Sequence, residues 1–203
     1  MNYIARFALV VCTAALAGAC TAAAPPAPAA DTTAPATTPA MSSMSQVERG
    51  KYIVNTSACH DCHTPAKMGP NGPEPDMARM LSGHPESEKV TTPAKLSGPW
   101  MAAASTTFTA WSGPWGISYT ANLTPDQNTG LGIWTEDMFI RAIREGKHMG
   151  TSRPILPPMP WPVYRNFTDE DLKAIFAYLK SIPPVTNRVP DPIINEPPAP
   201  GKK

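Results

Sequence analysis

Proline limits what this chain can fold into more than any other feature of its sequence. The chain has 26 prolines among 203 residues, whereas about 5 % is usual in soluble proteins. Because proline fixes φ and has no backbone N–H, it is excluded from helix interiors and from central strands. We therefore expect much of the chain to be loop or extended linker, and we expect no continuous sheet.

The charge of the chain argues against partners that are bound through bulk charge. Seventeen basic and 16 acidic residues give a formal net charge of +1, so nucleic acid is not an expected partner. All four cysteines lie within the first 62 residues, which is not the spread of a disulfide framework.

Residues 1–19 are typical of an export signal peptide. Arg6 gives a basic start, and residues 7–17 form an apolar stretch of 11 residues, too short to span a bilayer. Residues 16–20 fit an ordinary cleavage site and also resemble a bacterial lipobox. In the lipobox interpretation, which we favour, lipidated Cys20 anchors an exported, periplasmic protein to a bacterial membrane; plain secretion is the alternative.

Composition divides the remaining chain into three parts. Residues 20–45 are dominated by Ala, Pro and Thr and offer few large side chains to bury, which predicts a semi-extended linker. Residues 183–203 hold seven prolines in 21 residues and predict a Pro-rich tail. The globular domain is therefore expected at residues 46–182, enough for one small core.

Residues 59–63 read Cys-His-Asp-Cys-His, the C-x-x-C-H string of covalent haem attachment. Two intervening residues let one helical turn present the thiols of Cys59 and Cys62 to one porphyrin edge, and His63 then points a ring nitrogen at the iron. A redox pair and a zinc site are disfavoured, because no βαβ pattern and no second Cys/His pair accompany the string. The string occurs once, which predicts one haem c per chain.

A six-coordinate iron needs a second axial ligand, and we predict Met159. Residues 153–162 contain five prolines in ten residues, so they form a stiff extended wall that can hold one thioether over a haem. Met149 is the alternative. The other candidates are expected to be surface histidines (His60, His84 and His148), methionines that fill gaps in the core (Met68, Met77, Met80 and Met101) and a helix-face residue (Met138).

Three segments without proline predict helices. Residues 46–58 end in the C-x-x-C-H string. Residues 135–146 begin with a threonine cap and two acids and end at a glycine. Residues 168–182 start with a capping-box-like Thr-x-x-Asp, carry an apolar stripe and are followed by two prolines. Helices with long irregular connections predict an all-α, loop-rich domain.

The chain resembles class I cytochromes c in the order of four motifs, CHDCH, NLTPDQNTGLGIWTEDMFIRAIREGKHMG, ILPPMPWPVY and FTDEDLKAIFAYLKSIPPV. It is especially similar to the haem modules in cytochrome subunits of bacterial periplasmic alcohol, aldehyde and sugar-acid dehydrogenases. The resemblance covers residues 46–63 and 117–185. It implies the class I cytochrome c fold, with three main helices, long loops and a Pro-rich distal loop.

For the site, the resemblance implies thioether bonds from Cys59 and Cys62, His63 as the proximal ligand and Met159 as the distal ligand of the haem iron. It also implies that the first and last helices cross near Gly50 and Tyr178. The chain departs from these relatives in two ways. They often carry three haem modules, whereas the string occurs once here, and residues 64–116 form a longer insertion than expected.

The insertion contains a turn pair, Asn71-Gly72, and three tryptophans, Trp100, Trp111 and Trp115. We expect a packed Ω-like loop, with a cover over a haem edge or a partner surface as the alternatives.

These residues are compatible with three functions. With His63 and Met159 on both faces, the iron can only change oxidation state, which predicts an electron carrier rather than an enzyme, serving a periplasmic or membrane-associated respiratory chain. Its partners would be a redox donor and acceptor, such as a periplasmic dehydrogenase and a terminal oxidase. The alternatives are a haem enzyme or gas sensor with an open or labile sixth position, and a membrane-tethering subunit of a dehydrogenase complex.

Overall fold

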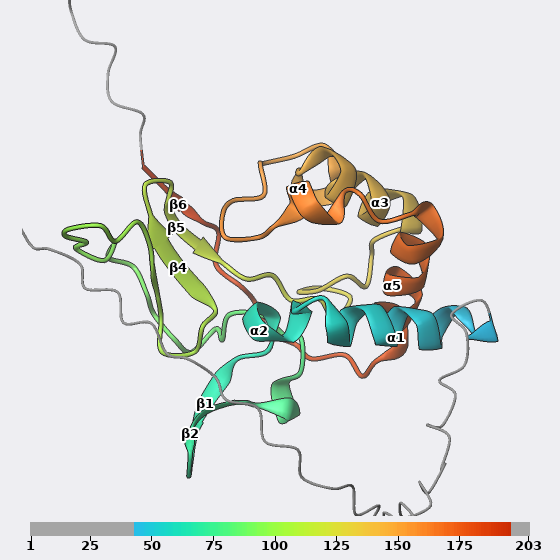
Figure 1. Cartoon of the computed structure of the whole chain (residues 1–203), viewed down its shortest axis with the longest axis horizontal. Coiled ribbons are helices and arrows are strands. Elements are labelled where there is room, and N and C mark those ends of the chain that lie inside the picture. The colour runs from blue at the N-terminus through green and yellow to red at the C-terminus, as the bar shows by residue number, and fades with distance from the viewer. Residues whose placement is uncertain (1–42, 196–203) are drawn as a thin grey trace, which may run out of the picture. The chain divides into compact units, whose positions relative to one another are not determined.

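The computed structural model describes residues 43–195 (Figure 1). The predicted signal peptide, Cys20 and all but the last three positions of the predicted linker lie outside the described residues. So do residues 196–203 of the predicted tail. Among the residues that are described, no helix has the length and apolar character needed to cross a membrane.

The three helices expected from the sequence are confirmed. The helices of residues 43–195 are α1 (Gln46–Thr56), α2 (Cys59–His63), α3 (Glu136–Glu145), α4 (Trp161–Tyr164) and α5 (Asp169–Ser181), with 3-10 turns η2 (Met77–Arg79) and η3 (His148–Gly150). Thr135 and Thr168 cap the N-termini of α3 and α5 as predicted, and Gly146 ends α3 with a φ of 65°. These local signals fix where each helix begins and ends.

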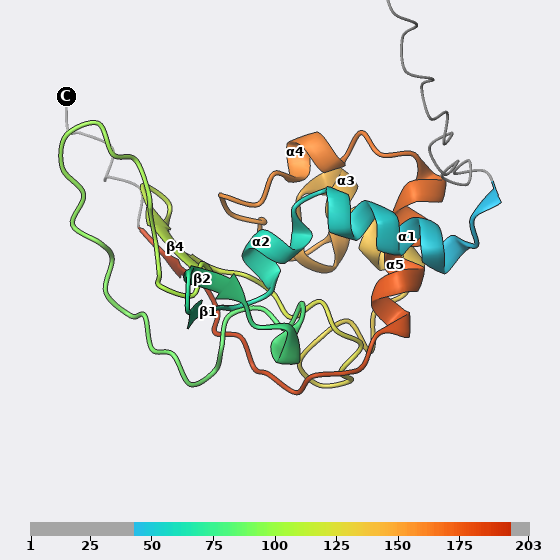
Figure 2. The same cartoon turned by 60° about the horizontal axis from the view of Figure 1, so that its bottom comes forward.

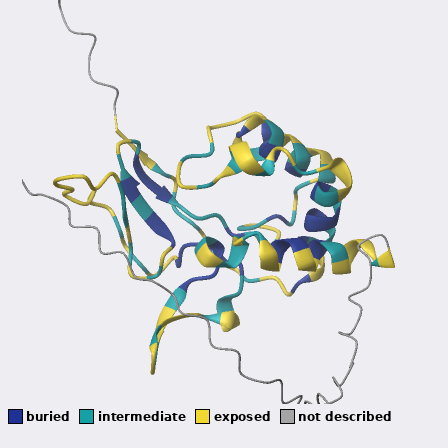
Figure 3. Ribbon diagram, viewed as in Figure 1, coloured by how far each residue is buried: buried dark blue, intermediate teal, exposed yellow. Residues whose placement is uncertain are grey.

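Helices α1 and α5 cross at Gly50, and this crossing builds the core. A Cβ atom added to Gly50 would lie 1.8 Å from the backbone oxygen of Ala174 and 2.9 Å from Cβ of Tyr178, so only glycine permits the approach. The predicted crossing near Gly50 and Tyr178 is thereby confirmed. Buried side chains gather around it on the facing sides of α1, α3 and α5 (Figure 3), and they include Ile53, Val54, Phe139, Ile143, Leu172, Ile175, Phe176 and Leu179.

The expectation of an all-α domain is wrong, because the described residues also form two antiparallel sheets. One is a hairpin of β1 (Ala66–Gly69) and β2 (Gly72–Pro75). The other has the order β3-β4-β5-β6, with strands Ala103–Ala104, Ala110–Gly113, Gly116–Tyr119 and Ile193–Ile194. In Figures 1 and 2 this four-stranded sheet lies on one side of α2, and α5 lies on the other.

Proline accounts for the wrong prediction. Its exclusion from central strands holds, since β4 and β5 contain none and Pro114 lies in the turn between them. Pro73 and Pro75 lie on β2, which is an edge strand. However, strands of two to four residues need no long apolar run, so no alternating pattern reveals them. Gly72 and Gly116, with φ of 116° and 109°, allow the tight turns that join the hairpins.

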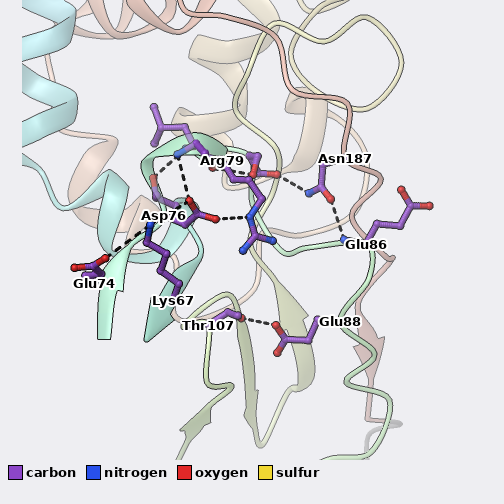
Figure 4. Close-up of polar contacts among 12 residues, drawn as sticks. Lys67, Glu74, Asp76, Arg79, Glu86, Glu88, Thr107 and Asn187 are labelled. Carbon is purple, nitrogen blue, oxygen red and sulfur yellow. Dashed lines mark hydrogen bonds and ion pairs between the residues drawn. The ribbon is translucent and has the colours of Figure 1, made fainter. Parts of the chain in front are cut away.

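The segment of residues 64–116, expected as an Ω-like loop, contains β1 to β4, whereas residues 80–102 form no helix or strand. Polar contacts within the segment are shown in Figure 4. Arg79 Nε donates to Asp76 Oδ2 at 2.8 Å, and Thr107 donates to a carboxylate oxygen of Glu88 at 2.8 Å. Such contacts at a surface contribute about 0.2–1 kcal/mol each. The insertion therefore combines short strands with an irregular connection at residues 80–102.

The described part of the predicted Pro-rich tail, residues 183–195, packs back onto the domain. Asn187 Nδ2 donates to the carbonyl oxygens of Ser82 and His84 at 2.7 and 2.8 Å. Its Oδ1 accepts from the backbone N–H of Glu86 at 2.9 Å (Figure 4). Beyond Asn187, β6 pairs with β5. These contacts fasten the segment at two points.

Candidate cofactor cavity

A cavity of about 720 Å³ lies between the helices and the start of the four-stranded sheet. Its wall is formed by α2, by the segment that joins β5 to α3, by one face each of α3 and α5, by η3, by the Pro-rich segment around Met159 and by the strap of residues 188–192. A volume of about 300–1,000 Å³ is typical of sites that enclose a cofactor or a small ligand. The cavity therefore has room for a large, mostly apolar group.

A backbone turn before the C-x-x-C-H string aims its side chains at the cavity. Helix α1 ends at Thr56, and Ala58 takes a left-handed conformation with φ 58°. The chain changes direction there and starts α2, from which Cys59, Cys62 and His63 all reach the cavity wall. The structure thus brings the three predicted attachment residues together on one short helix.

The two cysteines are free thiols and are not activated as nucleophiles. Burial raises the pKa of Cys59 to about 11, and burial with the nearby charge of Asp61 raises the pKa of Cys62. Redox C-x-x-C motifs have a thiol whose pKa is lowered. The environment of Cys59 and Cys62 therefore does not suit disulfide exchange, in agreement with the sequence analysis.

His63 has the setting of a metal-ligating histidine. Its ring is buried, with 8 % of the residue exposed, and Nδ1 lies 2.8 Å from the carbonyl oxygen of Ala121. A proton on Nδ1 is donated to that oxygen, which leaves the Nε2 lone pair free, and no described residue bonds Nε2. Burial lowers the pKa of His63, so the ring is neutral. A backbone partner on one nitrogen is the usual way in which a ligating imidazole is oriented.

Both methionines that were considered as the second ligand line the cavity. Met159 is partly buried and packs against the hydrophobic core, and its segment is fixed where Ser118 Oγ donates to the carbonyl oxygen of Pro157 at 2.5 Å. Met149 lies in η3 with a left-handed φ of 55°. The cavity wall thus offers one sulfur from each of two segments.

The donor set fits a porphyrin better than a bare metal ion. Within residues 43–195, no group of three or more His, Cys, Asp or Glu side chains is placed to hold a metal. One imidazole and one thioether cannot complete a coordination shell, whereas a haem brings four nitrogen ligands of its own. Two thiols beside the imidazole would provide the covalent attachment of such a group.

The other candidate ligands lie elsewhere or have other roles. His84 is fully buried rather than at the surface, because its ring bonds Thr109 Oγ1 at 2.9 Å and the carbonyl oxygen of Glu88 at 3.1 Å. His148 is half-buried on the cavity wall, with its ring 5.2 Å from that of Trp134. His60 bonds Thr64 and Asn55. The expectation for the methionines was right for Met80, which packs on the core, and wrong for Met68, Met77 and Met101, which are exposed.

One wall residue, Arg188, was not predicted. It reaches the cavity from the strap, a segment that returns from far along the chain, and no local pattern signals such a return. Trp111 reaches the cavity from β4, in the insertion for which a cover over a haem edge was an alternative. Trp134 and Arg153 also line the cavity, and both lie inside segments that the sequence analysis used, although neither was named there as a wall residue.

No family model matches the chain, but curated relatives do. It is 31 % identical over 159 residues, 77 % of its length, to one of the subunits of nicotinate dehydrogenase from Pseudomonas putida. It is 28 % identical over 142 residues, 70 % of its length, to the fructose dehydrogenase cytochrome subunit of Gluconobacter japonicus. Over 65 residues, 32 % of its length, it is 42 % identical to the gluconate 2-dehydrogenase cytochrome c subunit of Pantoea cypripedii. The matches span 10 %, 22 % and 14 % of these relatives.

Proposed function

The chain resembles the haem modules of the cytochrome c subunits of bacterial dehydrogenases, and on this premise we propose that it transfers electrons in a respiratory chain through a covalently bound haem c. One observation carries the proposal: a single short helix presents two free thiols and a neutral, oriented imidazole to one enclosed cavity. The presence of one C-x-x-C-H string supports one haem per chain.

Four residues of the chain have separate roles in binding the haem. When bound, the haem supplies an iron that gains and loses one electron. Cys59 and Cys62 would hold the porphyrin by thioether bonds, and His63 Nε2 and Met159 Sδ would be the two protein ligands to the iron. With two protein ligands on the iron, a substrate would find no free position there, so the chain would act as an electron carrier rather than as a catalyst. A methionine ligand favours the ferrous form and raises the reduction potential.

Met159 is proposed in preference to Met149 because its position is better fixed. Its segment is stiffened by prolines, held by Ser118 at Pro157 and packed against the core. Met149 lies in η3, where Gly150 N–H donates to the Lys147 carbonyl oxygen at 2.8 Å, but unlike Met159 it is not among the side chains that pack against the hydrophobic core. The two residues therefore make a matched pair for a test.

Optical spectra of the purified, haem-loaded full chain test the function. We expect a low-spin spectrum, no carbon monoxide binding by the reduced protein, and a methionine–iron charge-transfer band in the oxidised protein. The band should be lost in Met159→Ala and retained in Met149→Ala. Loss in Met149→Ala alone would reassign the ligand. Ready carbon monoxide binding by the native reduced protein would replace the carrier with an enzyme or gas sensor.

The proposal places the protein in the periplasm, tethered to a membrane by lipidated Cys20, with a dehydrogenase as donor and a terminal oxidase as acceptor. The signal-like residues 1–19 and the lipobox-like residues 16–20 support the location, and the names of the relatives support a dehydrogenase. Mass spectrometry of the mature protein tests the anchor. A diacylglyceryl group on Cys20 is expected, with release of Cys20→Ser from the membrane fraction. An unmodified N-terminus at Cys20 would favour plain secretion.

A further inference from the structure

Two side chains with permanent positive charge line the cavity, Arg153 and Arg188, and neither guanidinium group has a hydrogen-bond or ion-pair partner among residues 43–195. The ion pairs within residues 43–195 involve neither of them. The single hydrogen bond at Arg188 uses its backbone N–H, which donates to Glu86 Oε2 at 3.3 Å. An unpaired guanidinium at the rim of an apolar cavity is suited to a carboxylate, which it binds through two parallel hydrogen bonds.

The backbone that carries Arg188 is rigidly held. Asn187, directly before it, bonds Ser82 and His84 through its side chain and Thr129 Oγ1 through its backbone N–H. After it, Ile193 pairs with Ile117 in the sheet. The strap between these points, residues 188–192, runs along the cavity wall. The rim position of Arg188 is therefore set by the fold rather than by its own side-chain contacts.

A second group on the same wall also has no partner. Thr120 Oγ1 is the one buried side-chain oxygen or nitrogen in the described part of the chain that makes no hydrogen bond, and Thr120 lines the cavity. Two hydrogen bonds connect Thr120 to Asn187, the residue directly before the strap: His84 N–H donates to the Thr120 carbonyl oxygen at 2.9 Å, and Asn187 donates to the His84 carbonyl oxygen. A buried hydroxyl is normally hydrogen-bonded, so an unbonded one on the cavity wall is available to a group bound in the cavity.

We propose that Arg188 and the Thr120 hydroxyl bind a propionate carboxylate of the haem. This inference rests on the proposed function. Thioether formation uses the vinyl groups of haem and leaves both propionates as carboxylates, and a carboxylate at an apolar cavity needs charged or hydrogen-bonding partners. Thr120 directly precedes Ala121, whose carbonyl oxygen orients His63. The proximal ligand and the propionate site would thus share one stretch of backbone.

Arg153 serves as the matched control. It also lines the cavity and also lacks an ion pair, but it lies beside His148, whose pKa is lowered by burial and by the charge of Arg153 and raised by Asp191. The backbone of Arg153 is bonded to η3, where His148 N–H donates to the Arg153 carbonyl oxygen at 2.9 Å, and no described hydrogen bond connects Arg153 to Thr120. Arg188→Gln and Arg153→Gln each remove one charge at the cavity rim.

Resonance Raman spectra of the haem-loaded full chain report the propionate-bending mode, and a spectroelectrochemical titration reports the midpoint potential. We expect Arg188→Gln to shift the propionate mode and to favour the ferric form by about threefold, Arg188→Lys to keep part of the effect, and Thr120→Val to shift the mode. Arg153→Gln should leave the mode unchanged. Thermal unfolding of each variant establishes that the fold is intact.

Three outcomes would overturn the inference. One is an unchanged propionate mode in Arg188→Gln, and another is an equal shift in Arg153→Gln. The third is a change only in electron transfer with an added protein partner, which would make Arg188 a docking residue. Failure of the proposed function would appear separately, as absence of covalent haem or as carbon monoxide binding in the unmodified protein.

Discussion

The phenol of Tyr164 donates a hydrogen bond to the carbonyl oxygen of Ser57 across 107 positions of sequence. Tyr164 is the last residue of α4, which follows the Met159 segment, and Ser57 lies two residues before Cys59. Burial raises the pKa of Tyr164, so the phenol stays protonated and remains a donor. One bond therefore connects the segment of the proposed distal ligand with the start of the haem-attachment helix.

Tyr164→Phe is expected to loosen this connection. Loss of the donor should cost about 1 kcal/mol, and the methionine–iron band of the oxidised protein should disappear at a lower temperature than in the unmodified protein. Absorbance during a thermal scan measures this, with circular dichroism reporting global unfolding. Tyr52→Phe, at an exposed phenol on α1, is the control and should have no effect. An unchanged midpoint for the band in Tyr164→Phe would refute the connection.

Gly50→Ala tests the helix crossing. Because the added methyl group would lie 1.8 Å from the Ala174 oxygen, α1 and α5 must move apart, at a cost of about 3 kcal/mol. Chemical denaturation of the haem-loaded protein gives the free energy of unfolding. Lys51→Ala, at the next position of α1 and exposed, should change it by less than about 0.5 kcal/mol. Equal stability of the two variants would mean that the helices do not cross so closely.

Asn187→Ala tests the fastening of the strap. The substitution leaves the carbonyl oxygens of Ser82 and His84 without their donor, and unsatisfied buried groups cost about 1–3 kcal/mol. Denaturation should show a loss of about 2 kcal/mol. Asn195→Ala removes a side-chain bond to Pro114 at an exposed position and should cost far less. The prediction fails if Asn187→Ala is as stable as Asn195→Ala.

Acidification should destabilise the fold through His84. Burial lowers the pKa of His84 below its ordinary 6.5. The backbone and the charge of Glu88 act in the opposite direction and raise this pKa, and the charge of Lys89 lowers it further. The unfolded chain therefore binds a proton as the pH falls below about 6.5, while the folded chain does not, so the free energy of unfolding decreases in that range. In His84→Gln, denaturation between about pH 7.5 and 5.5 should show a shallower decrease. An identical pH dependence in the two proteins would exclude this role.

The sequence predicted those parts of the fold whose signals are local. Thr135, Gly146 and Thr168 mark helix ends by their own side chains or backbone freedom, and the apolar stripe of α5 needs no distant partner to be recognised. The four-stranded sheet could not be predicted in this way. Its strands β3, β4 and β5 pair with near neighbours in the sequence but have only two to four residues, too few for an alternating pattern. Its last strand pairs Ile193 with Ile117, and no local signal relates two short apolar segments that lie so far apart in the sequence.

The residues of the site also differ in whether a local signal predicted them. Cys59, Cys62 and His63 form one local string, and they lie together on the cavity wall. His84 stands in a turn-like sequence that predicts exposure, yet Thr109 and the Glu88 carbonyl enclose its ring. Burial of a single polar side chain is decided by such distant partners, which is why it escaped prediction. Met159 lines the cavity, and its bond to iron stays a prediction.

The strap of residues 188–192 also bears on the order of assembly. It supplies part of the cavity wall but follows Cys62 by more than a hundred positions, so contacts across this side are non-local, and such contacts are slow to form. In the export that we propose, the cysteines would emerge well before the strap. A porphyrin would then be joined to an open α2, and the last wall would close over a group that is already attached.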